Sequence, residues 1–419
     1  MDALTHFFGH DKAFYTDRDA GFTAEEIAQQ PRLWTELGAI MAAKQGEIAS
    51  FLARTGDLKK RRIVFTGAGS SAFIGDALAP LVGNDAGLHI ESVPTTDIVS
   101  APDSYLFADI PTLLVSFARS GNSPESVGAV NYARAIVSDL YEVAITCDPA
   151  SKLYDYTSQS DKSLILVMPE GSNDKGFAMT SSVSCMLLAG YLLFAGDASG
   201  RANGGSTGGG TGDSTGDLLP DIDLLAQSVS AAAPGYAEVA QRYAERDFDR
   251  IAFLGSGFLK SIAHEASLKM MELTNGIVNG SFESSTGFRH GPKSVIKDKT
   301  ITVHLVSPDP FTARYDLDLL REVYRQKKQN LVIAIGGEDA GELVGDEILR
   351  VATQDYRAGK SLCVGLEMLV FCQIFALYTS LSLGITTDNP SPTGEVNRVV
   401  QGVTVYELPT AGTDSTARR

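Results

Sequence analysis

The sequence predicts an α/β protein with two tandem, doubly wound parallel sheets related by internal duplication. Three observations support this prediction. Short β-branched and aromatic runs alternate with segments of helical period, and a glycine-rich turn follows one such run in each half of the chain. The second half also repeats the first. Strands that alternate with helices form parallel sheets whose two faces are both covered.

The repeat can be followed residue by residue. The run Arg62-Ile-Val-Phe-Thr-Gly-Ala-Gly-Ser matches Arg250-Ile-Ala-Phe-Leu-Gly-Ser-Gly-Phe, which lies 188 residues later. At the same offset the run at 112–117 falls on 300–305, and Val143 falls within a residue of Val332. Three runs that keep one offset favour a duplicated domain over coincidence.

The remaining elements follow in order. Thr23 and Glu26 have the spacing of a capping box, which predicts a helix start there, and a second helix is expected over about 33–52. A Gly/Ser/Thr-rich stretch then divides the two sheets. The first sheet is expected to have strands at 63–65, 112–117, 141–146 and 163–168, with helices at 71–81, from 124 and at 179–194. The expected boundaries are a helical segment at 1–50, a first domain at 51–197, a linker or loop at 198–217, a second domain at 218–387 and a tail at 388–419.

Residues 362–384 are apolar and long enough to span a bilayer, but they contain Glu367 and Gln373. A carboxylate near the centre of a bilayer is costly. We therefore expect a central core helix, which could also lie at a subunit interface.

Composition and charge exclude several classes of function. The chain of 419 residues has 35 lysines and arginines against 51 aspartates and glutamates, a net charge of -16, which disfavours nucleic-acid binding. The four cysteines are isolated in apolar segments, and the six histidines lack metal-ligand spacing. The amino terminus lacks the apolar core of a signal peptide. We expect a cytoplasmic protein without a metal, a membrane partner or a nucleic-acid partner.

Two hydroxyl-rich turns predict a phosphate pocket. Each follows a strand and opens a helix, where free backbone amides attract anions, and the carboxyl ends of neighbouring strands are where open α/β sheets bind ligands. The third glycine, Gly75, is one residue late for the dinucleotide fingerprint. Capped turns without a ligand remain the alternative. The candidate phosphate ligands are Ser70, Ser71, Arg119, Ser120, Asn122 and Ser123.

The second half carries the candidate proton-transfer groups. Glu265, Lys269 and Glu272 share one face of a helix over 258–274, as either a proton shuttle or a solvated ion-pair stripe. His290 precedes a Gly-Pro turn and is either functional or a structural loop residue. The turn Ser307-Pro-Asp-Pro lacks a hydroxyl cluster and carries a carboxylate, so only the first copy resembles a phosphate cradle. His264 is expected to be a helix-packing residue and His304 a strand residue.

The order of three motifs resembles the SIS (sugar isomerase) domain, in particular the isomerase half of glucosamine-6-phosphate synthase. These motifs are Phe253-Leu-Gly-Ser-Gly, Ala263-His-Glu-Ala-Ser-Leu-Lys-Met-Met-Glu and His290-Gly-Pro. The segments Glu26-Ile-Ala-Gln-Gln-Pro-Arg-Leu-Trp and Asp388-Asn-Pro-Ser-Pro resemble one branch more narrowly. That branch is the galactosamine-6-phosphate deaminase family, long labelled tagatose-6-phosphate ketose/aldose isomerase.

The resemblance implies roles for particular residues. Glu272 would move a proton between C1 and C2 of the sugar, with Lys269 from the same run beside it. His290 would open the sugar ring and would reach the site across the interface of a homodimer. Ser71, Ser120 and Ser123 would hold the sugar phosphate, with Arg119 beside them. The chemistry would need no cofactor.

Departures from the synthase refine the expected activity. Residue 2 is Asp2, no glutaminase domain precedes the repeats, Ala118 replaces one serine of the phosphate loop, and Gln401 stands where the synthase has a catalytic lysine. These departures favour an enzyme that releases ammonia, converting galactosamine 6-phosphate to tagatose 6-phosphate, with Gln401 as a substrate contact. The alternatives are an isomerase of a non-amino sugar phosphate and a sugar-phosphate sensor without turnover.

Overall fold

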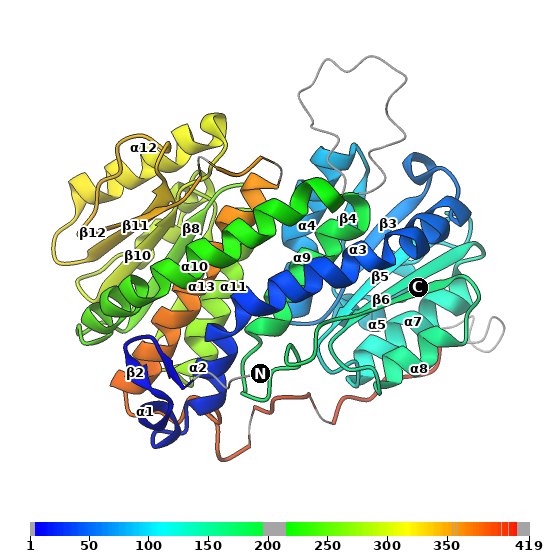
Figure 1. Cartoon of the computed structure of the whole chain (residues 1–419), viewed down its shortest axis with the longest axis horizontal. Helices are drawn as coiled ribbons and strands as arrows, with labels where there is room; N and C mark the ends of the chain where they lie inside the picture. Colours follow the sequence, from blue (N-terminus) through cyan, green and yellow to red (C-terminus); the bar gives the residue numbers. More distant parts are fainter. Residues whose placement is uncertain are drawn as a thin grey trace, which may run out of the picture.

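The computed structural model describes residues 5–195, 215–353, 355–357, 359–394, 396–400 and 402–408. Most of the expected linker at 198–217, the last eleven residues of the expected tail, and Gln401 lie outside this part of the chain. Figure 1 shows the two sheets at opposite ends of the molecule, with long helices between them.

Each half contains one five-stranded parallel sheet. The sequence predicts a parallel sheet in each half, but for the first sheet it predicts only four strands and misses the one at Ile90–Ser92. The first sheet has the order β4-β3-β5-β6-β7. It consists of β3 (Arg62–Thr66), β4 (Ile90–Ser92), β5 (Thr112–Ala118), β6 (Leu140–Thr146) and β7 (Ser163–Val167). The second sheet has the order β12-β11-β10-β8-β9. It consists of β8 (Arg250–Gly255), β9 (Asn279–Glu283), β10 (Thr300–Leu305), β11 (Leu331–Gly337) and β12 (Glu347–Val351).

Strand register confirms the duplication. Arg62 pairs with Thr112 in the first sheet, and Arg250 pairs with Thr300 in the second. The third strand departs slightly from the constant offset, because Val143 pairs with Val115 whereas Ile333 pairs with Val303. The strands around each sheet centre are therefore equivalent, with a shift of two residues at the third.

Helices cover both faces of each sheet. The first half contains α4 (Ser70–Ala86), α5 (Thr95–Ser100), α6 (Pro102–Tyr105), α7 (Pro124–Ile136), α8 (Lys152–Ser158) and α9 (Ser181–Ala195). The second half contains α10 (Thr215–Ala244), α11 (Leu259–Leu273), α12 (Pro310–Gln326) and α13 (Lys360–Ser382). The amino-terminal part comprises the β1 (His6–Phe7) and β2 (His10–Asp11) hairpin, α1 (Lys12–Thr16), α2 (Gly21–Ala28) and α3 (Gln30–Arg54). Short 3-10 turns lie at Leu58–Lys60, at η3 (Gly287–His290) and at η4 (Pro292–Val295).

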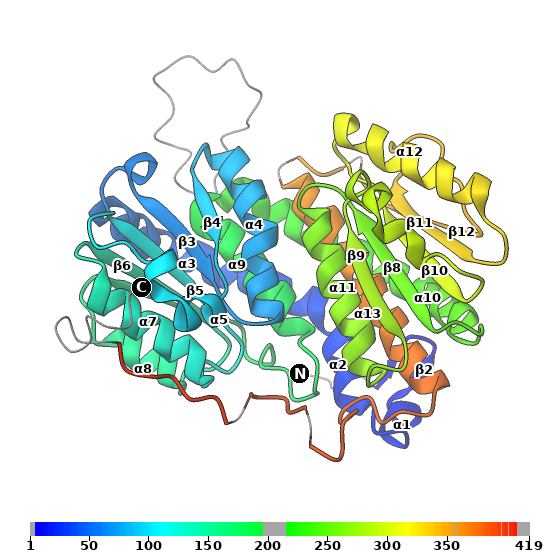
Figure 2. The ribbon, with the colours of Figure 1, turned by 180° about the vertical axis from the view of Figure 1, so that it is seen from behind.

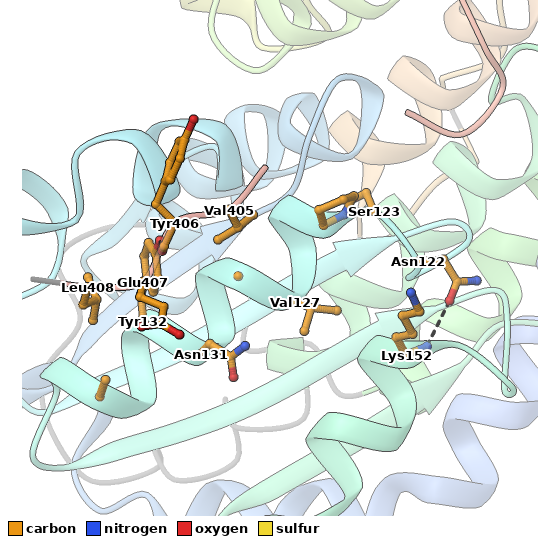
Figure 3. Close-up of a pocket in the computed structure, with 13 residues that line it drawn as sticks. Asn122, Ser123, Val127, Asn131, Tyr132, Lys152, Val405, Tyr406, Glu407 and Leu408 are labelled. Carbon is orange, nitrogen blue, oxygen red and sulfur yellow. Dashed lines mark hydrogen bonds between the residues drawn. The ribbon is translucent and has the colours of Figure 1, made fainter. Parts of the chain in front are cut away.

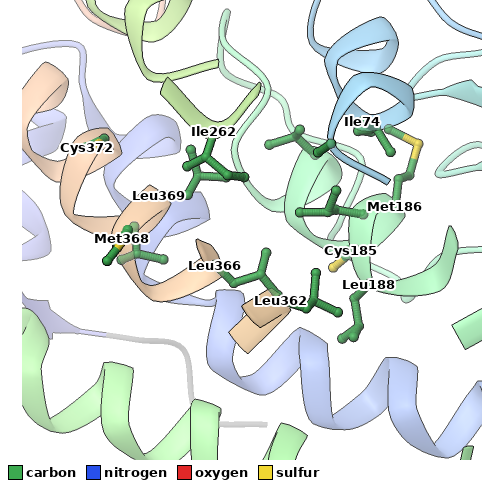
Figure 4. Packing of buried hydrophobic residues seen from close by; sticks show 14 of the residues in the cluster. Ile74, Cys185, Met186, Leu188, Ile262, Leu362, Leu366, Met368, Leu369 and Cys372 are labelled. Carbon is green, nitrogen blue, oxygen red and sulfur yellow. The ribbon is translucent and has the colours of Figure 1, made fainter. Parts of the chain in front are cut away.

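The helix α13 forms the centre of the molecule. By length and composition it could cross a membrane, but its apolar window is 100% buried. Its two polar residues have partners: Tyr236 donates to Glu367 at 2.8 Å, and Gln30 donates to Gln373 at 2.7 Å. The expectation of a core helix is therefore confirmed. Figure 4 shows residues of this helix packed near α9 and Ile262 of α11.

The predicted capping box at Thr23 is wrong. The helix α2 begins at Gly21, and its N-cap residue Ala20 makes no side-chain cap. Asp388, distant in the sequence, accepts hydrogen bonds from the backbone amides of Phe22 and Thr23 at 2.9 and 2.8 Å. The free amides at the helix start are thus satisfied by a tertiary contact rather than a local one.

Candidate active site

The strand order places the two hydroxyl-rich turns together. From β3 the chain crosses to β4 on one side, whereas β5, β6 and β7 continue on the other. The turns after β3 and β5 therefore flank the point where the strand order reverses, which is the usual ligand position in open α/β sheets. The equivalent point of the second sheet lies between β8 and β10.

The turn after β3 needs both of its glycines. A Cβ on Gly67 would lie 2.5 Å from the backbone of Ser71, and Gly69 has a φ of +55°. These two positions bring the chain sharply into α4, so that Ser70 and Ser71 occupy its first turn. The hydroxyls of Ser70 and Ser71 therefore lie beside the free backbone amides at the start of α4.

The turn after β5 is fixed by its own side chains. Ser123 is the N-cap of α7 and accepts a hydrogen bond from the amide of Ser126 at 3.3 Å, as the sequence predicts. Asn122 accepts from the amide of Lys152 at 3.1 Å, and Ser120 accepts from the amide of Asn122 at 3.4 Å. The turn is therefore ordered without any ligand. Because the Ser120 oxygen accepts a hydrogen bond here, its own proton can be donated to an anion.

Arg119 is buried behind this turn. Its guanidinium donates to the carbonyl of Phe177 at 3.2 Å and to the carbonyl of Arg398 at 2.5 Å. Burial lowers the pKa of Arg119, while the nearby carboxylates of Asp174 and Glu272 oppose this effect. An arginine keeps its charge under such a shift. Arg119 thus connects the loop after β7 and the carboxyl-terminal segment to the turn, with its positive charge near Glu272.

The helix α11 brings its three charged residues against the first half. Lys269 is fully buried, with its Nζ 3.0 Å from the Ser70 hydroxyl oxygen and 3.4 Å from Glu265. It also pairs with Glu272. The hydroxyl of Ser70 donates to Glu265 at 3.1 Å. Figure 2 shows α4 and α11 facing one another near the middle of the molecule, and the two helices are in contact.

This cluster is a buried link and not a solvated stripe. The side chain of Lys269 is 0% exposed and that of Glu265 is 3% exposed, whereas Glu272 is 25% exposed. Glu272 is therefore the member that a substrate can reach. The helical spacing predicts that Glu265 shares a face with Lys269 and Glu272, but the sequence does not reveal its contact with Ser70.

Burial and charge act in opposite directions on the cluster. Burial raises the pKa of Glu265 to about 7, although the ammonium of Lys269 opposes the rise. Burial alone would lower the pKa of Lys269, but the carboxylates of Glu265 and Glu272 outweigh it and raise the pKa. Lys269 is therefore held as an ammonium ion beside Glu272.

The other candidate residues lie elsewhere. His290 ends η3 and is exposed, and within the described part of the chain its imidazole makes no hydrogen bond. His264 is stacked between Phe73 and Phe282, with ring centroids 3.5 and 3.7 Å away, which confirms a packing role. His304 is buried in β10, as expected. Gln401 lies outside the described residues.

The second sheet has its own carboxylate at the equivalent point. Asp316 of α12 accepts from the hydroxyls of Ser256 and Ser285 at 2.5 and 2.6 Å, and from the amide of Ser307 at 3.0 Å. Asp309, the carboxylate that the sequence places in this turn, instead caps α12 by accepting from Thr312 at 2.8 Å. The second switch point is therefore filled by a side chain of the protein.

A cavity of about 560 Å³ lies beside the turn after β5 (Figure 3). It runs from Asn122 and Ser123 along α7 to the carboxyl-terminal residues 405–408. The segment is held there because the Tyr132 hydroxyl donates to the carbonyl of Tyr406. Among the described residues, no three His, Cys, Asp or Glu side chains gather as metal ligands.

Comparisons with known proteins agree with this geometry. The SIS domain family matches residues 58–196. D-galactosamine-6-phosphate deaminase AgaS from Shewanella sp. (strain ANA-3) is 39% identical over 397 residues, covering 93% of each chain. A structure from Clostridium novyi NT, assigned as a tagatose-6-phosphate ketose/aldose isomerase, has a TM-score of 0.89 at 36% identity and covers 96% of this chain and 99% of its own. The C-terminal domain of glucosamine-fructose-6-phosphate aminotransferase from Francisella tularensis has a TM-score of 0.73 at 17% identity, covering 88% of this chain and 98% of its own, which supports the fold alone.

The duplicated parallel sheets, with one pair of hydroxyl-lined turns facing a buried Lys–Glu cluster, define the class: this is an enzyme of two tandem SIS domains. The match to full-length relatives narrows that class. The chain belongs to the AgaS family of D-galactosamine-6-phosphate deaminases, as the sequence resemblance indicated.

Proposed function

We propose that this enzyme converts galactosamine 6-phosphate and water into tagatose 6-phosphate and ammonium. The observation that supports the proposal most directly is the contact between the halves. Lys269 bridges Ser70, at the start of α4, and Glu272 of α11. The partly exposed carboxylate of Glu272 thus lies beside the turns that would hold the phosphate. The names of relatives at 39% identity point to the same substrate.

The phosphate would bind in the two turns of the first half. Ser71, Ser120 and Ser123 offer hydroxyls there, together with the free amides at the starts of α4 and α7. Ser70 and Asn122 are proposed to act in support, because Ser70 donates to Glu265 and Asn122 ties the turn to Lys152. Arg119 would contribute positive charge from behind. Because an acidic chain repels anions at long range, it needs such local contacts to bind a phosphate.

Glu272 would act as the general base and then as the acid. After ring opening, it would remove the C2 proton of the open-chain amino aldehyde and return it to C1. The resulting C2 iminium would add water, lose ammonium and leave the C2 ketone. Lys269 would hold the Glu272 carboxylate in place. This sequence needs no cofactor or metal, because the C1 carbonyl already acidifies the C2 proton.

His290 would open the sugar ring in the site of a second copy of the chain. In its own chain, the neighbouring Phe288 packs in the apolar cluster under α12, on the opposite face of the sheet from α11. A homodimer with shared sites would bring the exposed imidazole to a partner's Glu272. We further propose a cytoplasmic location and a substrate contact for Gln401. The same proposal assigns phosphate binding to 51–197 and catalysis to 218–387.

An ammonium-release assay over galactosamine, glucosamine and mannosamine 6-phosphates tests the proposal. We expect ammonium and tagatose 6-phosphate in equal amounts from the galactosamine substrate, with lower rates from the other two hexosamine phosphates. Absence of ammonium from all three would refute deamination. Turnover of tagatose 6-phosphate alone would support the second candidate, plain isomerisation, which the assignment of the Clostridium novyi structure favours. No turnover of any of them would favour a sensor.

A further inference from the structure

An acidic residue of α12 holds the turn that carries His290. The Glu322 carboxylate accepts from Nε of Arg289 at 2.7 Å and also pairs with Lys293. Arg289 reaches Asp318 of the same helix at 3.0 Å. These two cations stand one residue before and three residues after His290, so that one carboxylate fixes the turn on both sides of the imidazole.

Two residues that precede His290, Ser285 and Phe288, also hold the same turn against the protein. Ser285 donates to Asp316 at 2.6 Å, and Phe288 is 1% exposed within the apolar cluster under α12. The imidazole of His290 is exposed and makes no side-chain hydrogen bond to the described part of its chain. The direction of its side chain therefore depends on the backbone of the turn.

The ion pairs of Glu322 are better suited to orienting the turn that carries His290 than to stabilising the fold. Exposed ion pairs contribute little to folding, because solvent screens them and ordering long side chains costs entropy. Here one carboxylate that is 22% exposed orders two long cationic side chains. Their hydrogen bonds lower the pKa of Glu322, so it stays ionised. Losing its charge would leave Arg289 with Asp318 alone and Lys293 with Gln326 alone, and would loosen the turn.

We propose that Glu322 is a positioning residue that orients His290 for ring opening, although it lies on a helix with no residue of its own in the proposed reaction. The inference rests on the proposed role of His290. Reactions that depend on a placed proton-transfer group lose up to about a hundredfold in rate when that group moves by an ångström. Binding of the sugar phosphate does not depend on this turn.

The test is a double-mutant cycle in the full-length enzyme, read as kcat and KM for ammonium release from galactosamine 6-phosphate. Glu322→Gln is expected to lower kcat about tenfold while KM stays within about twofold. His290→Asn is expected to lower kcat further. Combining the two is expected to add nothing to His290→Asn. Asp247→Asn serves as the control, since Asp247 pairs with Lys299 at the opposite ends of the strands of the same sheet. It is expected to leave both parameters unchanged.

The outcomes separate the two proposals. If His290→Asn keeps full activity, the assignment of His290 itself is refuted. If His290→Asn is impaired while Glu322→Gln behaves like the wild type, or if the two losses multiply, the positioning role of Glu322 is refuted. If Glu322→Gln does not fold, Arg289→Gln removes the Arg289–Glu322 ion pair instead. Wild-type behaviour of that variant, or a loss that multiplies with that of His290→Asn, would then refute the positioning role.

Discussion

The two switch points of the molecule have the same architecture and opposite contents. In the first sheet the turns after β3 and β5 present Ser71, Ser120 and Ser123 at helix starts. In the second sheet the turns after β8 and β10 close around Asp316. In the second copy, the Asp316 carboxylate thus accepts hydrogen bonds from donors whose equivalents in the first copy are proposed to bind a phosphate. On the proposed function, one copy of the fold binds an anion, whereas in the other copy Asp316 fills the equivalent position.

The second copy is proposed to contribute chemistry instead of binding. Its helix α11 carries Glu272 to the edge of the first copy, where Lys269 joins it to Ser70. The proposed active site is therefore composite, and neither half contains all of its parts. The experiments below separate the contributions of the two halves, in order of expected effect.

The largest effect is expected at Glu272. Replacing it by glutamine removes the group that moves the proton, so turnover is expected to fall at least about a thousandfold. Binding of inorganic phosphate is expected to survive, because the turns of the first copy are untouched. Ammonium release and phosphate calorimetry measure the two properties. Activity near that of the wild type would show that another group is the base.

The next effect is expected at Asp316. Asp316→Asn places an amide among donors that now meet a carboxylate, so at least one donor loses its partner. We expect the free energy of unfolding to fall by about 3 kcal/mol. Urea titration at pH 7 measures it. Asp309→Asn is a matched control, because asparagine also caps helices, and is expected to cost less than about 0.5 kcal/mol. Equal losses would mean that the filled site has no special importance.

A smaller effect is expected in the first copy. The pair Ser120→Ala and Ser123→Ala removes two hydroxyls and is expected to weaken phosphate binding about fiftyfold. Ser256→Ala, in the second copy, is the control, because its hydroxyl is bound to Asp316. It is expected to leave phosphate affinity unchanged. The comparison fails if the control weakens binding as much as the serine pair does.

The smallest effect concerns the link between the halves. The folded-state pKa of Glu265, about 7, lies above its ordinary value of 4.5, because burial disfavours the ion. Wild-type stability from this group is therefore fully present below about pH 4.5 and is lost as the pH rises to about 7. Glu265→Gln cannot ionise, so its stability relative to wild type is expected to rise by about 2 kcal/mol from pH 4.5 to 6.5. A pH-independent difference in urea titrations would contradict the buried-acid assignment.

How far the sequence predicted these features depends on how local each one is. The repeat, both sheets, the N-cap at Ser123 and the core helix over 362–384 follow from patterns within a few residues or from a constant offset. The capping box at Thr23 failed because Asp388, some 365 residues away, satisfies the helix start instead. The contact of Ser70 with Glu265 and the filling of the second turn by Asp316 are also tertiary. Neither contact can be predicted from the spacing of residues within a short segment of the sequence.

The most direct test of the composite site is a crystal structure of the Glu272→Gln enzyme with galactosamine 6-phosphate. The account predicts one sugar per chain, with its phosphate on Ser71, Ser120 and Ser123 and its C1 and C2 within reach of residue 272. Asp316 would still fill the second switch point. A phosphate bound between β8 and β10, or a sugar whose first two carbons point away from α11, would contradict the account.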